Sequence, residues 1–282
     1  MAILVDNSQV LMSAIFSHAD ISTVSEDMVR HIVLNCYRSY RQKFGSEYGE
    51  LVICQDSSPS WRHDYFENYK ANRKKARKDD PQKWKMFFEI MNNIRNEIAE
   101  VFPYKNMKVS RCEADDIIAV LCRDICVREK VLILSGDKDF IQLHIHPNVV
   151  QYSPIQKKFV TNSNPSQFLK EHIVKGDASD GIPNIFSADD VFIDENKRQT
   201  PATKKRNDEV LKHLATSGRV ENKYSVNWDR NDTLINLLNI PVEYQEQILT
   251  EWNIPENKTR SKILNYMIDK KLNNLMSDIG DF

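Results

Sequence analysis

The chain has 282 residues, of which 41% are hydrophobic and 28% charged, and its formal net charge is -1. This composition excludes a disordered or low-complexity chain, and the near-neutral balance excludes an overall basic protein while leaving local basic patches open. Five cysteines in no regular framework predict reduced thiols and a cytoplasmic location. The start, MAILVDNSQVLMS, lacks the basic region of a signal peptide, and no apolar run is long enough to cross a membrane.

Short apolar runs alternate with longer stretches of helical periodicity in the first half of the chain. The short runs predict buried strands at 2–5 (AILV), 51–54 (LVIC) and 131–135 (VLILS). The periodic stretches predict helices from a capping box at Thr23 and Glu26 to Gly45, from Pro81 to Phe102, and from about Arg111 to Arg128.

The order strand–helix–strand–helix–helix–strand predicts an α/β fold with a central, mainly parallel sheet flanked by helices. After the runs VVQYS at 149–153 and KFVT at 158–161 the strand signals fade, and from Pro165 onward the pattern is mostly helical. We therefore expect an α/β core over residues 1–165, followed by a helical C-terminal domain over residues 166–282.

Carboxylates follow three predicted strands at the point where each strand ends. Asp6 ends the first strand, Asp56 follows the second, and Asp137 and Asp139 follow the third. Because the carboxyl ends of parallel strands meet at one edge of an open sheet, these side chains should share a cleft. Further acidic side chains have the spacing to join them, because they lie adjacent or three apart near helix starts: Glu113, Asp115, Asp116, Asp177 and Asp180.

These nine carboxylates predict a metal site. A single aspartate after a strand is usually a turn residue or a helix cap, but the repetition strand after strand favours metal binding. All ligands would be oxygens, with no histidine or cysteine among them, which suits Mg²⁺, with Mn²⁺ as a substitute, better than Zn²⁺. The ligands are too many for one octahedral ion, and two ions are the usual arrangement for phosphodiester cleavage.

The segment WRHDYFENYKANRKKARKDD at 61–80 interleaves cations with aromatic rings. Cations bind phosphates and rings stack on bases, although a solvated basic helix face is the commoner role of such a run. Its place after the strand that ends near Asp56 favours nucleic-acid binding, because it would overhang the acidic cleft. Its charge predicts that the part at 69–80 is mobile without nucleic acid. The candidate contacts are Tyr69, Lys70, Arg73, Lys74, Lys75 and Arg77.

Four motifs resemble those of the 5′-nuclease superfamily, which comprises flap endonucleases and the 5′-nuclease domains of DNA polymerases. YKANR at 69–73 is similar to its arch motif, and CEADD at 112–116 and SGDKDF at 135–140 are similar to its acidic motifs. GDASDGIP at 176–183 is similar to the start of its helix–three-turn–helix element. Over most of the chain the likeness is to the replication ribonucleases H of T-even bacteriophages, in stretches such as LVDNSQ, LHIHPNV and QYSPIQKKFV.

The resemblance assigns roles to individual positions. Lys70 and Arg73 fall on the catalytic pair that steers the scissile phosphate. A helical arch at about 61–85 is implied over the cleft, and a DNA-binding role is implied for the C-terminal domain. Metal ligands fall on eight positions, with Asp116 as a ninth that is not acidic in all relatives: Asp6, Asp56, Glu113, Asp115, Asp137, Asp139, Asp177 and Asp180.

The chain departs from the superfamily's pattern after GDASD. Gly181 stands where relatives usually have Asn, and Asn184 stands where they have Gly. The segment FSADDVFIDENKRQTP at 186–201 occupies the space of a glycine-rich hairpin. The resemblance therefore implies a divergent helix–three-turn–helix element.

The activity implied is that of a divalent-metal-dependent 5′→3′ exonuclease and flap endonuclease that acts on RNA primers or DNA at 5′ ends during lagging-strand replication. The expected partners are DNA and RNA–DNA duplexes with 5′ ends or flaps, with replication proteins such as a single-strand-binding protein. A monomer in a host-cell cytoplasm is expected. Two other functions are weighed. One is a non-catalytic DNA-junction-binding protein. The other is a haloacid-dehalogenase-type phosphatase, which needs a second aspartate two residues after the first, where this chain has Ser8.

Overall fold

The fold is that of a computed structural model, which describes residues 1–17, 24–256 and 258–282, without the side chains of 74–76. Six strands form one sheet in the order β3-β2-β1-β4-β5-β6. All neighbouring strands are parallel except β5 and β6, which are antiparallel, so the expected mainly parallel sheet is confirmed. The strands are β1 Ala2–Asp6, β2 Leu51–Cys54, β3 Lys105–Met107, β4 Val131–Leu134, β5 Val149–Ser153 and β6 Lys158–Val160.

Helices cover both faces of this sheet, so its central strands are apolar throughout. Successive residues of a strand point to opposite faces. Ile3 and Val5 of β1 accordingly join the apolar cluster formed with α1 Asn7–Phe16, α2 Glu26–Tyr48 and α5 Pro81–Val101. Ala2 and Leu4 join the cluster on the other face, formed mainly with α6 Ala114–Ile125.

The helix α2 differs from its expected bounds at both ends. Its N-cap is Ser25, whose side chain accepts a hydrogen bond from the backbone of the first turn, whereas the expected cap, Thr23, lies outside the described residues. The helix also continues through Gly45 and ends at Gly49, whose φ of 84° lies in the left-handed region. A glycine within a helix reduces stability only modestly, and here the apolar face of α2 against the sheet outweighs it.

The helix α6 is shorter than the expected span of 111–128. Arg111 has a φ of 65° and cannot belong to a right-handed helix, so the helix begins only after Glu113, which has an extended conformation at the N-cap. The shorter helix has a consequence for the cleft. Its first turn, with Asp115, begins at the carboxyl edge of the sheet.

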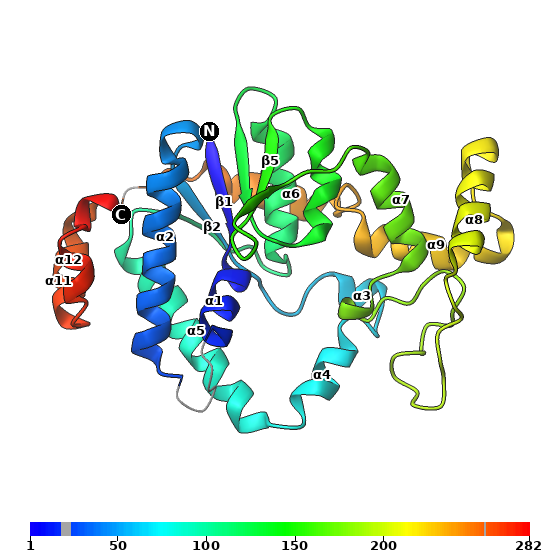
Figure 1. Cartoon of the computed structure of the whole chain (residues 1–282), viewed down its shortest axis with the longest axis horizontal. Helices are drawn as coiled ribbons and strands as arrows, with labels where there is room; N and C mark the ends of the chain where they lie inside the picture. Colours follow the sequence, from blue (N-terminus) through cyan, green and yellow to red (C-terminus); the bar gives the residue numbers. More distant parts are fainter. Residues whose placement is uncertain (18–23, 257) are drawn as a thin grey trace.

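Between β2 and α5 the chain leaves the sheet and forms the expected arch. It runs through α3 Arg62–Tyr65 and α4 Ala71–Arg77 before it returns along α5 (Figure 1). The helix α5 begins with Pro81 in its first turn and is capped by Asp80, whose carboxylate accepts a hydrogen bond from Lys83 N at 3.1 Å. The path of the chain from β2 to α5 therefore places the basic segment at 61–80 beside the cleft.

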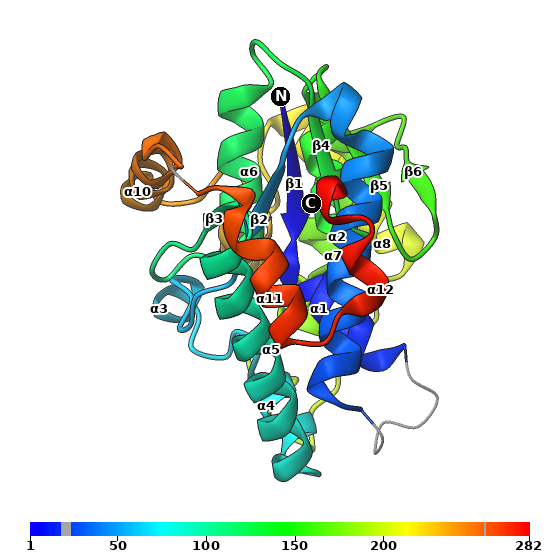
Figure 2. The ribbon, with the colours of Figure 1, turned by 90° about the vertical axis from the view of Figure 1, so that its left-hand side faces the viewer.

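The rest of the chain is mostly helical and returns to both faces of the core. Tyr244 and Ile248 of α10 pack with α6, whereas Met267, Leu275 and Phe282 pack with α2 and α5. Figure 2 shows α10 on the side of α6, and α11 and α12 in front, near α5 and α2. The domain boundary that the sequence pattern places at residue 165 stays a prediction. The elements are η2 Lys138–Ile145, α7 Pro165–Lys175, η3 Ala178–Asp180, α8 Lys204–Ser217, α9 Asn222–Ile235, α10 Val242–Asn253, η4 Arg260–Lys262, α11 Ile263–Asp269, α12 Asn273–Met276 and η5 Ile279–Asp281.

The divergent segment after GDASD is organised around Asn184. Its side-chain oxygen accepts hydrogen bonds from Phe186 N at 3.0 Å and Ser187 Oγ at 2.8 Å, and its amide donates to Thr200 O at 2.9 Å. A glycine at this position could form none of these contacts. Asn184 therefore closes the loop that leads to α8.

Among the described residues, no helix combines the length and the apolar character that crossing a membrane requires.

We predict that Phe282→Ala destabilises the fold by about 3 kcal/mol, because Phe282 is fully buried and its ring packs 5.5 Å from that of Phe102. Urea unfolding followed by circular dichroism measures the loss. Phe159→Ala is the control, since Phe159 is 47% exposed and its removal should cost less than about 1 kcal/mol. Equal losses in the two variants would show that the C-terminal segment does not belong to the cooperative core.

Candidate active site

The carboxyl ends of β1, β2 and β4 open into an acidic cleft of about 270 Å³. Eight of the nine carboxylates predicted from the sequence line it, together with Lys70 and Arg73 of the arch. The parallel sheet thus brings together side chains that are far apart in the sequence. The eight are Asp6, Asp56, Glu113, Asp115, Asp137, Asp139, Asp177 and Asp180.

Local hydrogen bonds hold the strand-end aspartates in place. The Asp6 side chain caps α1, and Ser135 Oγ donates to its Oδ2 at 3.0 Å. Asp56 accepts a hydrogen bond from Ala114 N at 2.9 Å and another from Ser8 Oγ. These aspartates therefore cap local structure, as a single aspartate after a strand usually does. They also face the cleft.

Burial and crowding raise the pKa values of three cleft carboxyls. Burial, followed by the charge of Asp56, raises the pKa of Asp6 to about 7. Burial, followed by the charge of Asp137, raises the pKa of Asp139 to about 7 and that of Asp115 well above its usual value. Protons or cations must offset the charge on these groups, as is typical of a metal site.

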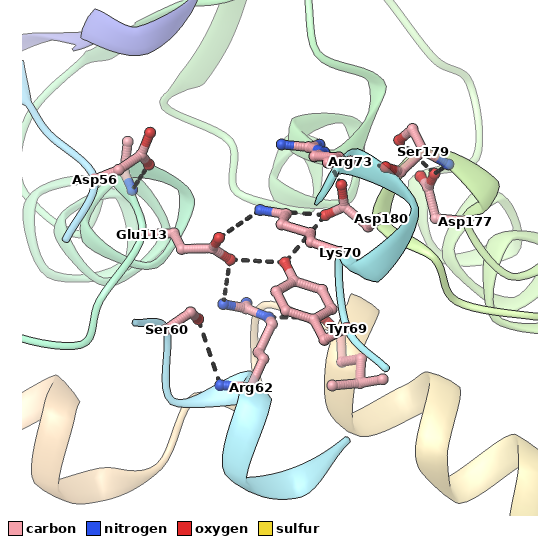
Figure 3. Close-up of polar contacts among 12 residues, drawn as sticks. Asp56, Ser60, Arg62, Tyr69, Lys70, Arg73, Glu113, Asp177, Ser179 and Asp180 are labelled. Carbon is pink, nitrogen blue, oxygen red and sulfur yellow. Dashed lines mark hydrogen bonds and ion pairs between the residues drawn. The ribbon is translucent and has the colours of Figure 1, made fainter. Parts of the chain in front are cut away.

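Glu113 is held ionised by the arch. Lys70 Nζ pairs with its Oε1, while Arg62 Nη1 at 3.1 Å and Tyr69 Oη at 2.7 Å donate to its Oε2 (Figure 3). Burial opposes ionisation, but Lys70 and Arg62 lower the pKa of Glu113 to about 2. Glu113 therefore connects the base of the arch to the floor of the cleft.

Asp116 does not line the cleft, so its assignment as a metal ligand is corrected. It is fully buried, and Arg62 binds it in bidentate fashion, with Nη2 2.8 Å from Oδ1 and Nη1 3.0 Å from Oδ2. Oδ2 also accepts hydrogen bonds from Trp61 Nε1 and Glu113 N. The motif CEADD contains two adjacent aspartates, and the helix directs only Asp115 to the cleft. Asp116 instead fixes Arg62, which in turn contacts Glu113.

The arch is joined to the cleft at a second carboxylate, Asp180. Arg73 Nη2 pairs with its Oδ1, Tyr69 Oη lies 3.0 Å from its Oδ2, and Lys70 N donates to its backbone oxygen at 2.7 Å (Figure 3). The base of the arch is thus attached to η3, although mobility of the segment at 69–80 stays a prediction.

The remaining candidate contacts lie further along α4. The Arg77 guanidinium lies over the rings of Trp84, at 5.4 Å, and Phe88, at 4.9 Å. The side chains of Lys74 and Lys75 lie outside the described residues. Their assignment as nucleic-acid contacts therefore stays a prediction.

His172 contacts two carboxylates of the cleft, and the sequence analysis did not identify it. It is buried on α7, and its Nε2 lies 3.2 Å from Asp177 Oδ2 while its Nδ1 lies 3.5 Å from Asp139 Oδ1. A histidine thus contacts two of the predicted carboxylates, whereas the all-oxygen ligand set stays a prediction. A single histidine in a helix belongs to no sequence motif. Only its place in the sequence, five residues before Asp177, could have indicated that it contacts the carboxylates.

Asp177 is the most strongly hydrogen-bonded carboxylate of the cleft. Its Oδ1 accepts from Ser179 N at 2.8 Å and Ser179 Oγ at 2.6 Å, and Lys138 Nζ lies 3.0 Å from its Oδ2. Burial opposes ionisation, but hydrogen bonds from His172, Ser179 and Lys138 hold the pKa of Asp177 well below its usual range. Asp177 is therefore a charged, fixed partner for its neighbours.

Comparison with known proteins identifies the family. The domain described as "5'-3' exonuclease, N-terminal resolvase-like domain" matches residues 1–173, and "T4 RNase H, C terminal" matches residues 165–282. Ribonuclease H of Enterobacteria phage T4 is 32% identical over 99% of this chain and 95% of its own length. The chain belongs to the 5′-3′ exonuclease family. A 5'-3' exonuclease of Buchnera aphidicola is 27% identical over 65% of this chain and 64% of its own length.

Solved structures show the same fold. The T5 D15 protein co-crystallised with metal ions has a TM-score of 0.63 at 16% identity, covering 99% of this chain and 97% of that one. The T5 D15 flap endonuclease in a pseudo-enzyme-product complex with DNA and metal ions has a TM-score of 0.63 at 14% identity, covering 96% and 98%. With the family established, the chain is a 5′-nuclease, a hydrolase of phosphodiesters, rather than a dehalogenase-type phosphatase.

We predict that the metal-free protein loses stability as pH rises. Asp6 and Asp139 have a folded-state pKa of about 7, above the unfolded value, so their favourable contribution is complete below about pH 4 and is lost as pH rises through about 7. Thermal melts in a chelator should show a midpoint that falls between about pH 5 and 8.

Millimolar Mg²⁺ should raise the midpoint most at the alkaline end, because a cation then replaces the missing protons and binds only the folded cleft. A midpoint in chelator that is constant or rises over this range would contradict the charge crowding described for the cleft.

Proposed function

We propose that this 5′-nuclease uses two divalent cations, Mg²⁺ in the cell with Mn²⁺ as a substitute, to cleave RNA primers and DNA flaps at 5′ ends during lagging-strand replication. The observation that supports the proposal is the acidic cleft under a cationic arch. Eight carboxylates face one space, and Lys70 and Arg73 project into it from the arch. Such an arrangement suits a metal-bound phosphodiester and has no evident use without one.

The residues present fit the cations. Asp139 Oδ1 is buried without a hydrogen-bond partner among the described residues, and burial, followed by the charge of neighbouring carboxylates, raises the pKa values of Asp6, Asp115 and Asp139. Carboxylate oxygens are the ligands that Mg²⁺ prefers. Two groups would hold the ions: Asp6, Asp56, Glu113 and Asp115 in one, and Asp137, Asp139, Asp177 and Asp180 in the other. Bound there, the cations would lower the pKa of the attacking water and stabilise the departing 3′-oxygen.

Lys70 and Arg73 would bind the scissile phosphate. Burial opposes the charge on Lys70, but Glu113 and Asp180 raise the pKa of Lys70 to about 12, so the ammonium is charged at every physiological pH. Both side chains reach the cleft from the arch, on the side away from the sheet. They would neutralise the equatorial oxygens as charge develops, and the product would keep a 5′-phosphate.

A second cavity, of about 480 Å³, adjoins the cleft beneath the arch and would take the single strand. It shares Ser8, Asp56, Lys70 and others with the cleft, and it is further lined by serines and by Arg77 and Arg95. Within the described part of the chain, neither arginine forms an ion pair.

Arg95 lines this second cavity from α5. Its Nη2 donates to Ser8 Oγ at 2.8 Å, while its Nε is buried without a hydrogen-bond partner among the described residues. Unpaired cations in a cavity that continues from the reaction site favour a phosphate backbone as their ligand.

The biological setting belongs to the same proposal. DNA and RNA–DNA duplexes with 5′ ends or flaps are the proposed substrates, supported by the T5 flap endonuclease complex with DNA, whose fold this chain shares. All five cysteines are free thiols, as expected in a cytoplasm. A monomer that acts beside a single-strand-binding protein completes the proposal. A non-catalytic junction-binding role is disfavoured because eight of the nine predicted carboxylates line one cleft.

We predict that Asp115→Asn lowers the rate of flap cleavage by about a thousandfold or more while DNA affinity changes little, because the change removes one ligand charge with almost no change in shape. Single-turnover cleavage and fluorescence anisotropy in Ca²⁺ measure the two effects. Asp124→Asn is the matched control, since Asp124 lies on the exposed side of the same helix. Turnover within a few-fold of wild type in Asp115→Asn would exclude this carboxylate as a ligand.

We predict that Arg77→Ala and Arg95→Ala each weaken binding of a duplex with a single-stranded 5′ flap and lower its salt slope by about 1, while a blunt duplex binds as before. Lys85→Ala is the control, because Lys85 lies on the exposed face of α5 and pairs only with Glu89 among the described residues. Equal losses of affinity for blunt and flapped duplexes would show that the single strand does not pass through this cavity.

A further inference from the structure

The corner of the cleft between α7 and the end of β4 contains two buried atoms that lack hydrogen-bond partners. Among the described residues, neither His172 Nδ1 nor Asp139 Oδ1 has one, although the two atoms lie only 3.5 Å apart. His172 is 6% exposed, so water does not offer an easy alternative partner. Buried polar atoms without partners destabilise a fold unless a proton, a water or an ion fills the gap.

The other ring nitrogen indicates which tautomer His172 adopts. Its Nε2 lies 3.2 Å from Asp177 Oδ2, the same oxygen that Lys138 Nζ contacts at 3.0 Å. An oxygen that accepts from the Lys138 ammonium accepts from a second donor as well, so Nε2 carries a proton. In the neutral imidazole the lone pair is then on Nδ1, the nitrogen nearest Asp139 Oδ1. A carboxylate that receives the distal N–H of a histidine is the usual support for a metal-binding imidazole.

The separation of the two unpartnered atoms fits a shared ion. Two ligands that are each about 2.1 Å from a tetrahedral ion lie about 3.4 Å apart. One carboxylate oxygen each of Asp139 and Asp177 and one ring nitrogen of His172 all lie within 4.8 Å of one another, so a further oxygen is close to the same position.

We propose that His172 binds a divalent transition-metal ion through Nδ1, together with Asp139, so that this half of the metal cleft is a mixed nitrogen–oxygen site. An imidazole ligand favours ions such as Co²⁺ and Zn²⁺ over Mg²⁺, which prefers oxygen. The inference deepens the proposed two-ion function and rests on it for the carboxylate ligands. It departs from the all-oxygen ligand set that the sequence predicts.

The test measures metal binding by the whole chain without nucleic acid. Isothermal titration calorimetry with Co²⁺ and with Mg²⁺ is compared for wild type, His172→Gln and His172→Lys. Both variants should bind Co²⁺ about tenfold or more weakly, with loss of the visible absorption of nitrogen-ligated Co²⁺. Their Mg²⁺ affinity should change by less than about twofold.

The lysine variant separates the proposal from its simplest rival, a protonated imidazole that only bridges Asp139 and Asp177 by charge. If His172 acts as that cation, lysine replaces it, and Co²⁺ binding by His172→Lys equals that of wild type, which overturns the proposal. Equal losses of Co²⁺ and Mg²⁺ in both variants also overturn it, because they indicate a general structural role. His213→Gln, on α8 outside the cleft, is the matched histidine control and should bind both ions as wild type does.

A measurement on the wild-type chain covers the case in which the variants fail to fold. The chain has 7 histidines. Nitrogen NMR of the imidazole rings should show Zn²⁺ shifting the Nδ1 signal of one buried histidine, with no such shift on addition of Mg²⁺. No shifted signal at saturating Zn²⁺ would overturn the proposal. Because no step of these tests uses a substrate, failure of the proposed cleavage activity would not affect their outcome, and normal cleavage would not rescue a negative one.

Discussion

Mutual repulsion among the cleft carboxylates is the constraint on which the rest of this structure depends. Eight acidic side chains face one small space, and burial makes each charge more unfavourable than it would be in water. The chain offsets part of that charge with its own cations. Lys70 and Arg62 reach Glu113, Arg73 reaches Asp180, and Lys138 reaches Asp177. Asp6, Asp115 and Asp139 receive no such cation in the described structure, and their raised pKa values mark where external charge is needed.

The surrounding fold holds the crowded carboxylates in place. A sheet buried on both faces fixes the strand ends, and α10 on one side with α11 and α12 on the other complete its two apolar layers. Asp116 and Arg62 form a fully buried ion pair behind the cleft, and Arg62 Nε also donates to Leu234 O at 2.9 Å. This pair ties the arch, the start of α6 and the end of α9 into one unit. The position of Glu113 therefore depends on residues that never touch a substrate.

The sequence predicts most of this architecture because its signals are local. Apolar runs mark the central strands, and the carboxylates after β1, β2 and β4 follow from the parallel sheet. The sequence could not separate Asp115 from Asp116, because their roles depend on where α6 begins, and the left-handed Arg111 sets that start. His172 was missed for a related reason. Its partners Asp139 and Asp177 meet it only through tertiary packing, and a histidine on an ordinary helix has no pattern of its own.

The ion pairs at the base of the arch bear on both metal binding and phosphate binding under the proposed function. Lys70 and Arg73, the side chains suited to a phosphate, are already engaged by Glu113 and Asp180 in the free protein. Under the proposed function, a cation that takes these carboxylates would set both side chains free, and a phosphate that takes the side chains would return the carboxylates to the cation. Each ligand would then remove the competitor of the other, and reciprocity requires that each raise the other's affinity by the same factor. The ion pairs at the base of the arch would in that case make the binding of metal and of nucleic acid cooperative.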